Sequence, residues 1–66
     1  MPIDPNKVTR ERRRAVLSQA AAATLARISP QRWSEIENGR RIEGIELRSA
    51  EAVALALGVS VDRISK

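Results

Sequence analysis

Capping residues divide the chain into short segments in which apolar and polar positions recur with a helical period. The pair Asp4-Pro5 is a favourable helix start, because aspartate accepts hydrogen bonds from free backbone N–H groups and proline suits the first helical position. Ser18 repeats the capping signal before an alanine-rich run, and Ser29-Pro30 repeats both parts of it. The pattern therefore predicts helix starts at about residues 5, 19 and 30.

Glycines mark where the later helices end, as expected for a stop in the left-handed conformation. Gly39 follows the third segment, and Gly58 follows a fourth, apolar one, after which Ser60 is expected to cap a last turn. The predicted fold is all-α, with five short helices in a single domain of residues 1–66. We expect the helices at about residues 5–15, 19–26, 30–38, 45–57 and 61–66.

The third segment has one apolar face and one polar face. At about 100° per residue, Trp33, Ile36 and Glu37 fall on one side of a helix. The opposite side carries Gln31, Ser34, Glu35 and Asn38. Trp33 is the only aromatic residue of the chain, and its place beside Ile36 predicts a buried core anchor. Small side chains at Ala22 and Ala23 on the preceding helix leave room for it.

Composition narrows the chemistry that the chain can perform. Among its 66 residues there is no cysteine and no histidine, which excludes disulfides and the usual zinc ligand sets. Without a glycine-rich phosphate loop or paired carboxylates on one face, we expect no enzyme, cofactor, metal or small-molecule ligand. No apolar run approaches membrane-spanning length and nothing resembles a signal peptide, so we expect a cytoplasmic protein that does not bind membranes.

Charge is distributed unevenly along the chain. The net charge is +4, but residues 1–41 hold nine Lys and Arg against four Asp and Glu, whereas residues 42–66 hold three against four. A basic half joined to a nearly neutral, apolar half predicts one surface for a polyanion and another for protein contacts.

Five short fragments of the sequence form a recognisable pattern. They are LSQ at residues 17–19, Ala23, IS at 28–29, S-x-IE-x-G-R at 34–40 and LALGVSVDRI at 55–64. Together, with no gap between Gln19 and Glu37, they resemble the Cro/repressor (XRE-type) helix-turn-helix proteins of phages and bacteria. The resemblance spans residues 8–64 and implies a lambda-repressor-like DNA-binding fold, with the helix-turn-helix at about residues 18–38.

The chain departs from the family pattern at a few positions. Arg27 stands where the family usually has a glycine in the turn, Val16 replaces the glycine before LSQ, and Ala22 replaces a leucine. A non-glycine residue with positive φ costs on the order of 1 kcal/mol, so we expect the turn at Arg27 to be strained.

The resemblance also implies roles for individual side chains. Phosphate contacts are expected from Gln19, Asn38, Arg40 and Arg41. Contacts to base edges in the major groove are expected from Pro30, Gln31, Arg32 and Glu35. Arg12 and Glu37 match a partly buried ion pair between the first and third helices, and an inward-facing carboxylate does need a partner.

The chemistry of these side chains agrees with the implied roles. Glutamine can pair with adenine through two hydrogen bonds, and arginine can do so with guanine. Glu35 repels phosphates unless it accepts from a cytosine amino group or holds Arg32 in place. Three further arginines are expected to be solvated or to bind non-specifically, namely Arg13, Arg14 and Arg27.

The leading interpretation is a sequence-specific regulator of transcription that binds double-stranded DNA. It would be a phage or bacterial repressor that occupies its operator in the nucleoid. One alternative is an antitoxin or restriction–modification controller that regulates its own operon. Another is a protein-interaction module that kept the fold without reading DNA, which Glu35 on the reading face and Arg27 in the turn favour. Salt-dependent binding to mixed-sequence duplex separates this last alternative from the others.

The carboxy-terminal part of the chain is expected to carry a surface for a second copy of the protein. One stripe of the fourth helix contains Leu47, Ala50, Val53, Ala54 and Leu57. Leu55 lies outside this stripe, while Val59 and Ile64 are expected to close the core. Candidates for a weak homodimer contact, strengthened on DNA, are Leu55 and Val61, with Asp62 and Arg63 at its rim. The expected operator is an inverted repeat with half-site centres about 10–10.5 base pairs apart.

Overall fold

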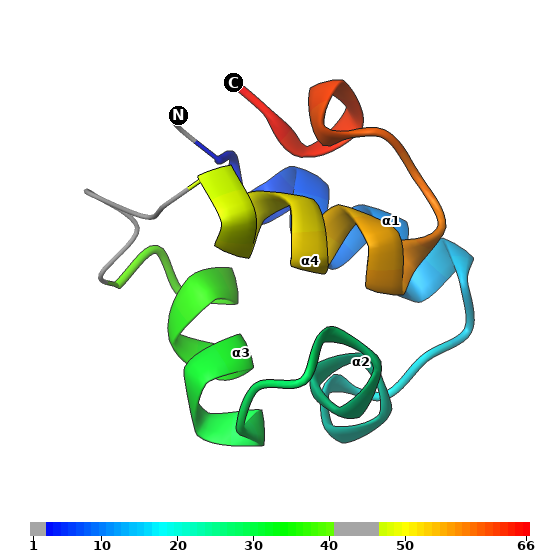
Figure 1. Ribbon diagram of the computed structural model, residues 1–66, viewed down its shortest axis with the longest axis vertical. Coiled ribbons are helices and arrows are strands. Elements are labelled where there is room, and N and C mark those ends of the chain that lie inside the picture. Colours follow the sequence, from blue (N-terminus) through cyan, green and yellow to red (C-terminus); the bar gives the residue numbers. More distant parts are fainter. Residues whose placement is uncertain (1–2, 41–46) are drawn as a thin grey trace.

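Residues 3–40 and 47–66, which the computed structural model describes, fold into four α-helices and one 3₁₀ helix. The elements are α1 (Pro5–Arg14), α2 (Gln19–Ala26), α3 (Pro30–Glu37), α4 (Leu47–Leu57) and η1 (Val61–Ile64) (Figure 1). The predicted all-α class is confirmed, but the last of the five predicted helices is a 3₁₀ turn. The predicted start of the fourth helix at residue 45 and the phosphate contact expected from Arg41 lie outside the described residues.

Side-chain caps begin the first three α-helices. The side chains of Asp4, Ser18 and Ser29 accept hydrogen bonds of 2.9–3.0 Å from backbone N–H groups two or three residues later. Each such cap stabilises a helix by about 1 kcal/mol, and all three stand where the sequence predicts them. Ser60 precedes η1 as its N-cap residue, as predicted, but its side chain accepts no capping hydrogen bond. In the 3₁₀ turn the backbone N–H of Arg63 donates to the Ser60 carbonyl at 3.1 Å, so it is not available to the Ser60 hydroxyl.

Left-handed residues connect the helices. Gly39 (φ 76°) follows α3 and Gly58 (φ 71°) follows α4, as predicted. Arg27 ends α2 with φ 61°, so the strain expected in the turn before α3 is confirmed. Val16, between α1 and α2, has φ 58° and is 89% exposed, a strained position that the sequence pattern did not predict. This backbone conformation costs a non-glycine residue about 1–2 kcal/mol.

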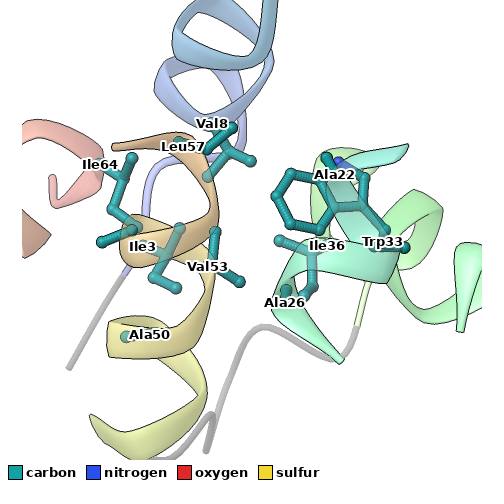
Figure 2. Close-up of a cluster of buried hydrophobic side chains, with 12 residues drawn as sticks. Ile3, Val8, Ala22, Ala26, Trp33, Ile36, Ala50, Val53, Leu57 and Ile64 are labelled. Carbon is teal, nitrogen blue, oxygen red and sulfur yellow. The ribbon is translucent and has the colours of Figure 1, made fainter. Parts of the chain in front are cut away.

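The core is built from aliphatic side chains around a single indole. Its buried apolar members are Ile3, Val8, Ala22, Ala23, Ala26, Trp33, Ile36, Ala50, Val53, Ala54, Leu57 and Ile64. Trp33 and Ile36 point from α3 toward the side chains of α1 and α4 (Figure 2), and both are almost completely buried, as predicted. The α2 helix contributes only alanines, which lets it pack closely against α3 and α4.

The two ends of the described chain are fastened to each other. Ile3 forms an isolated antiparallel bridge with Ser65, and the Asp4 N–H donates to the Ile64 carbonyl at 2.8 Å. Lys7 Nζ donates to the Ser65 carbonyl at 2.7 Å. Ile64 is fully buried, which confirms its predicted place in the core, and Ile3 joins it there. Consequently η1 lies against α1 and α4, at the end of the molecule opposite α2 (Figure 1).

Candidate nucleic-acid interface

Two packed helices joined by a tight turn, α2 and α3, form one end of the molecule. The Ile28 N–H donates to the Ala23 carbonyl at 3.0 Å, which closes the end of α2. The left-handed Arg27 then redirects the chain, so that α3 crosses α2 at a steep angle (Figure 1). Two helices arranged in this way form a helix-turn-helix, whose second helix can enter the major groove of DNA.

The outward side of α3 carries the side chains expected to contact DNA. Pro30, Gln31 and Asn38 are exposed, and Arg32 and Glu35 are half-buried. Arg40, beyond the helix, is also exposed. Trp33 and Ile36 are buried on the opposite side, so the orientation of α3 is fixed by the core. The reading face, which we define as Pro30, Gln31, Arg32 and Glu35, is therefore displayed at a defined angle.

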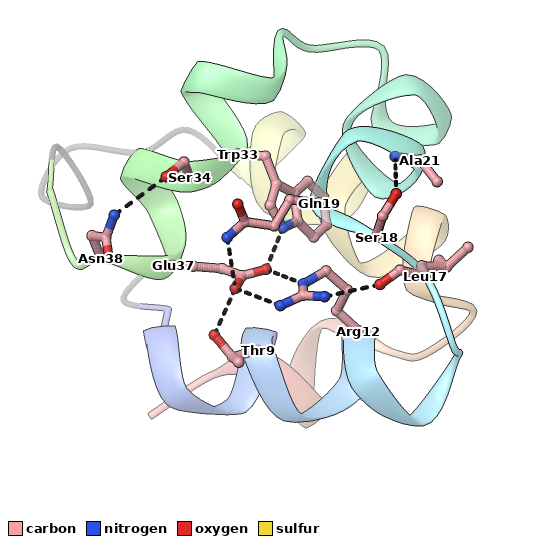
Figure 3. Close-up of polar contacts among 10 residues, drawn as sticks. All are labelled: Thr9, Arg12, Leu17, Ser18, Gln19, Ala21, Trp33, Ser34, Glu37 and Asn38. Carbon is pink, nitrogen blue, oxygen red and sulfur yellow. Dashed lines mark hydrogen bonds and ion pairs between the residues drawn. The ribbon is translucent and has the colours of Figure 1, made fainter.

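Glu37, at the end of α3, accepts hydrogen bonds from three helices. Arg12 Nε lies 2.5 Å from its Oε2, and Arg12 Nη2 lies 3.2 Å from its Oε1. Thr9 Oγ1 donates to Oε1 at 2.9 Å, Gln19 Nε2 donates to the same atom at 3.2 Å, and Trp33 Nε1 donates to Oε2 (Figure 3). The structure thus brings together the predicted pair Arg12 and Glu37. The Glu37 carboxylate connects α1 and the start of α2 to α3.

The environment of Glu37 favours its charged form. Burial by itself raises the pKa of this carboxyl, because a low-dielectric surrounding disfavours a charge. Hydrogen bonds from Arg12, Trp33, Gln19 and Thr9 outweigh that effect and hold the pKa below its ordinary value. Glu37 is therefore ionised at neutral pH, with a side chain only 5% exposed.

Arg12 and Gln19 are both held by this carboxylate. Arg12 also donates from Nη1 to the Leu17 carbonyl at 2.8 Å, which fixes the connection that precedes α2. Gln19 is the first residue of α2, the position at which the family resemblance implies a phosphate contact. An amide nitrogen carries two hydrogens. One of them is directed to Glu37, which leaves the other for a partner outside the protein.

Thr9 is a member of this site that sequence reasoning missed. It lies three residues before Arg12 on the same side of α1, and that spacing is the signal that could have identified it. Because threonine is common on exposed helix surfaces, the spacing alone does not indicate a carboxylate partner. Only the packing of α1 against α3 supplies it.

A second buried carboxylate, Glu11, was not predicted either. Its side chain is 4% exposed, and its Oε2 lies 3.1 Å from Arg10 Nη2 and 3.6 Å from Arg14 Nη1. Both arginines belong to α1 and are themselves largely exposed, with side chains 48% and 62% accessible. Glu11 is therefore neutralised within its own helix and is covered by the elements that pack on α1.

The residues expected at a dimer contact lie on α4 and η1. Leu55 is 80% exposed on α4, which agrees with its predicted place outside the buried stripe. Val61 is half-buried and packs against the core, while Asp62 and Arg63 are exposed on η1. The Leu47 side chain lies outside the described part of the chain, and the other four members of the stripe are buried.

Comparison with protein-family models matches residues 7–43 to a helix-turn-helix domain. No curated protein and no solved structure matches the chain. Within the described residues, no helix is long and apolar enough to cross a membrane. In that same part of the chain, no cluster of three acidic or other metal-ligating side chains could hold a metal ion.

Proposed function

The chain belongs to the helix-turn-helix domain family, and we propose that it is a sequence-specific DNA-binding regulator acting as a repressor by occupying its operator. One observation carries the proposal. α3 is held on its inner side by the buried Trp33 and the ionised Glu37, and it presents polar side chains on its outer side. A helix fixed in this way can read base edges without losing much conformational entropy on binding.

The reading face supplies the groups that base recognition needs. The major groove is about 12 Å wide and admits a helix. Gln31 is exposed near the start of α3 and can donate to and accept from adenine. Arg32, one residue later, can pair with guanine. Glu35 is half-buried on the same face and would accept from a cytosine amino group.

Phosphate contacts accompany this face. Gln19, at the start of α2, donates to Glu37 at the end of α3, and Asn38 and Arg40 follow that same end of the recognition helix. Arg41 would extend the second group. These contacts fix the position of the protein on the duplex and carry no sequence information of their own.

The proposed operator is an inverted repeat bound by two copies. One recognition helix covers only a few base pairs, which is too little to select a site in a genome. Leu55 is the best candidate for the contact between copies, because it is a large apolar side chain on α4 with 80% exposure. A contact of this size is weak on its own, so we expect dimers mainly on DNA.

Selection from random-sequence duplex, followed by sequencing, tests the function. We expect an enriched inverted repeat with half-site centres about 10–10.5 base pairs apart. Binding to the selected site should also weaken steeply as salt rises, because each neutralised phosphate releases counterions. Recovery of no preferred sequence, with equal affinity for all duplexes, would contradict the proposal.

A further inference from the structure

The outer side of α1 is a basic surface that the proposed operator contacts do not use. Asn6, Thr9, Arg10, Arg13 and Arg14 line an open hollow of about 630 Å³ on this helix. We call this set the α1 basic surface. Thr9 is half-buried and the other four residues are exposed.

The α1 basic surface keeps a positive charge after its internal ion pairs are counted. Arg10 and Arg14 share the single carboxylate of Glu11. Arg13 has no carboxylate within salt-bridge distance among the described residues. Three guanidinium groups against one carboxylate leave a net charge of about +2, concentrated on one helix face where it attracts anions.

Thr9 connects this surface to the candidate interface. It lines the hollow, and its Oγ1 donates to the same Glu37 oxygen that accepts from Gln19 Nε2. Thr9, at the edge of the α1 basic surface, and Gln19, the proposed phosphate contact, therefore share one carboxylate oxygen (Figure 3).

We propose that the α1 basic surface binds the sugar–phosphate backbone of DNA that flanks the operator. This inference rests on the proposed function and extends it to DNA outside the recognised sequence. Arg10 and Arg13 lie about 4.5 Å apart along the axis of α1, and each has a long side chain that can reach a phosphate of one strand. Arg10 and Arg13 can thus follow neighbouring phosphates.

The lining of the hollow favours a nucleic-acid backbone over an acidic protein segment. Every residue that lines it is polar or charged. Protein interfaces are anchored by buried aromatic or aliphatic side chains, and the hollow offers none. Arginine, threonine and asparagine are side chains that commonly contact phosphate oxygens.

Arg13 is the residue that tests the inference most cleanly. Arg10 and Arg14 also neutralise Glu11, so their removal would disturb a buried carboxylate. Arg13 has no such role and is exposed, so Arg13→Gln should fold normally. Lys66→Gln is the matched control, because it removes one positive charge at an exposed residue that follows η1 and has no proposed role.

Two duplexes carrying the same selected operator are compared by fluorescence anisotropy over a series of salt concentrations. One ends at the edges of the operator, and the other continues for ten base pairs of arbitrary sequence on each side. Wild type should bind the longer duplex more tightly and with a steeper salt dependence. Arg13→Gln should lower the steepness of log K against log salt on the longer duplex by about 0.9 per copy. When salt is reduced tenfold, the affinity of this variant should therefore rise about eightfold less than that of wild type. Arg13→Lys should retain most of that slope.

The outcomes separate this inference from the proposed function. The inference is overturned if wild type binds both duplexes equally. It is also overturned if Arg13→Gln has the affinity and salt dependence of wild type on the longer duplex. An equal loss in Arg13→Gln and Lys66→Gln overturns it too, because this would show an effect of net charge alone. In each of these cases a preserved preference for the operator leaves the proposed function intact. If wild type shows no preference for the operator on either duplex, the proposed function fails instead.

Discussion

Glu37 and Glu11 are two carboxylates with almost the same burial and different partners. Their side chains are 5% and 4% exposed. Glu37 accepts from α1, the start of α2 and its own helix α3, whereas Glu11 forms ion pairs with two arginines of its own helix α1. Glu37 connects three helices, whereas Glu11 pairs only with arginines of its own helix.

This difference shows that burial alone does not measure what a charged residue contributes. Removing a partner from a buried pair is costly when it leaves other polar groups without hydrogen bonds in the interior. Around Glu37 those groups include the half-buried Arg12 and the fully buried indole N–H of Trp33. Around Glu11 the cations reach solvent. The two sites should therefore respond differently to the same substitution.

Glu37→Ala is expected to have the largest effect. Loss of a buried charged partner typically costs about 3–5 kcal/mol, and each kcal/mol lowers the melting temperature of a domain this small by roughly 4–8 °C. Glu11→Ala should cost about 1 kcal/mol, the usual loss for a point substitution. Thermal unfolding followed by circular dichroism measures both variants. Equal losses in the two would show that Glu37 does not connect the helices as described.

Trp33→Phe is expected to have the next largest effect. Phenylalanine keeps most of the buried apolar surface but removes the N–H that donates to Glu37. A hydrogen bond to a charged group contributes about 1.5–3 kcal/mol, so the free energy of unfolding should fall by roughly that amount. Combining Trp33→Phe with Glu37→Ala should give less than the sum of the two losses, because both remove the same bond. Full additivity would argue against the shared bond.

Acid should weaken the protein through Glu37. The folded-state pKa of Glu37 lies below its ordinary value, so the carboxylate stabilises the fold fully above that ordinary value, about 4.3 in unfolded chains. The stabilisation is lost as the pH falls from there through the folded-state pKa. Urea unfolding between pH 7 and pH 3 should show this decline in wild type and a smaller one in Glu37→Gln. An identical decline in both would assign the acid sensitivity to other groups.

Replacing the strained residues by glycine should give the smallest effect, and in the stabilising direction. The left-handed backbone destabilises the folded protein by about 1–2 kcal/mol at each of Val16 and Arg27. Glycine removes this strain, but its greater freedom in the unfolded chain offsets about 0.5–1 kcal/mol of the gain. Val16→Gly should stabilise more than Arg27→Gly, because β-branched residues tolerate positive φ least. A Val16→Gly background also supplies the stability needed to compare the two carboxylates without global unfolding. Destabilisation by Val16→Gly in urea unfolding would contradict the strain.

Local signals in the sequence were sufficient to predict most of the helical framework. Asp4, Ser18 and Ser29 cap their helices as expected, because a cap is a contact between residues two or three positions apart. The burial of Trp33 and Ile36 follows from helical periodicity, which is also local. Arg27 was expected to be strained because the resemblance showed a glycine at that position.

Features that depend on contacts between distant segments could not be predicted in the same way. Ile3 is buried because it pairs with Ser65 at the other end of the chain. Glu11 is buried although a charged residue is normally expected at the surface. Thr9 joins the Glu37 site only because α1 packs on α3. The reading face follows from the period of α3, whereas the network that fixes it depends on the tertiary fold.

We propose that the network around Glu37 positions α3 so that its outer side chains read DNA. Competition binding with operators changed one base pair at a time tests it most directly, using wild type, Gln31→Ala and Gln19→Ala. Gln31→Ala should lose about 1–3 kcal/mol of discrimination at one base pair and keep its preference at the others. Gln19→Ala should weaken binding to all sequences alike. If Gln31→Ala kept the preferred sequence and its full margin at every position, α3 would not read DNA through this face.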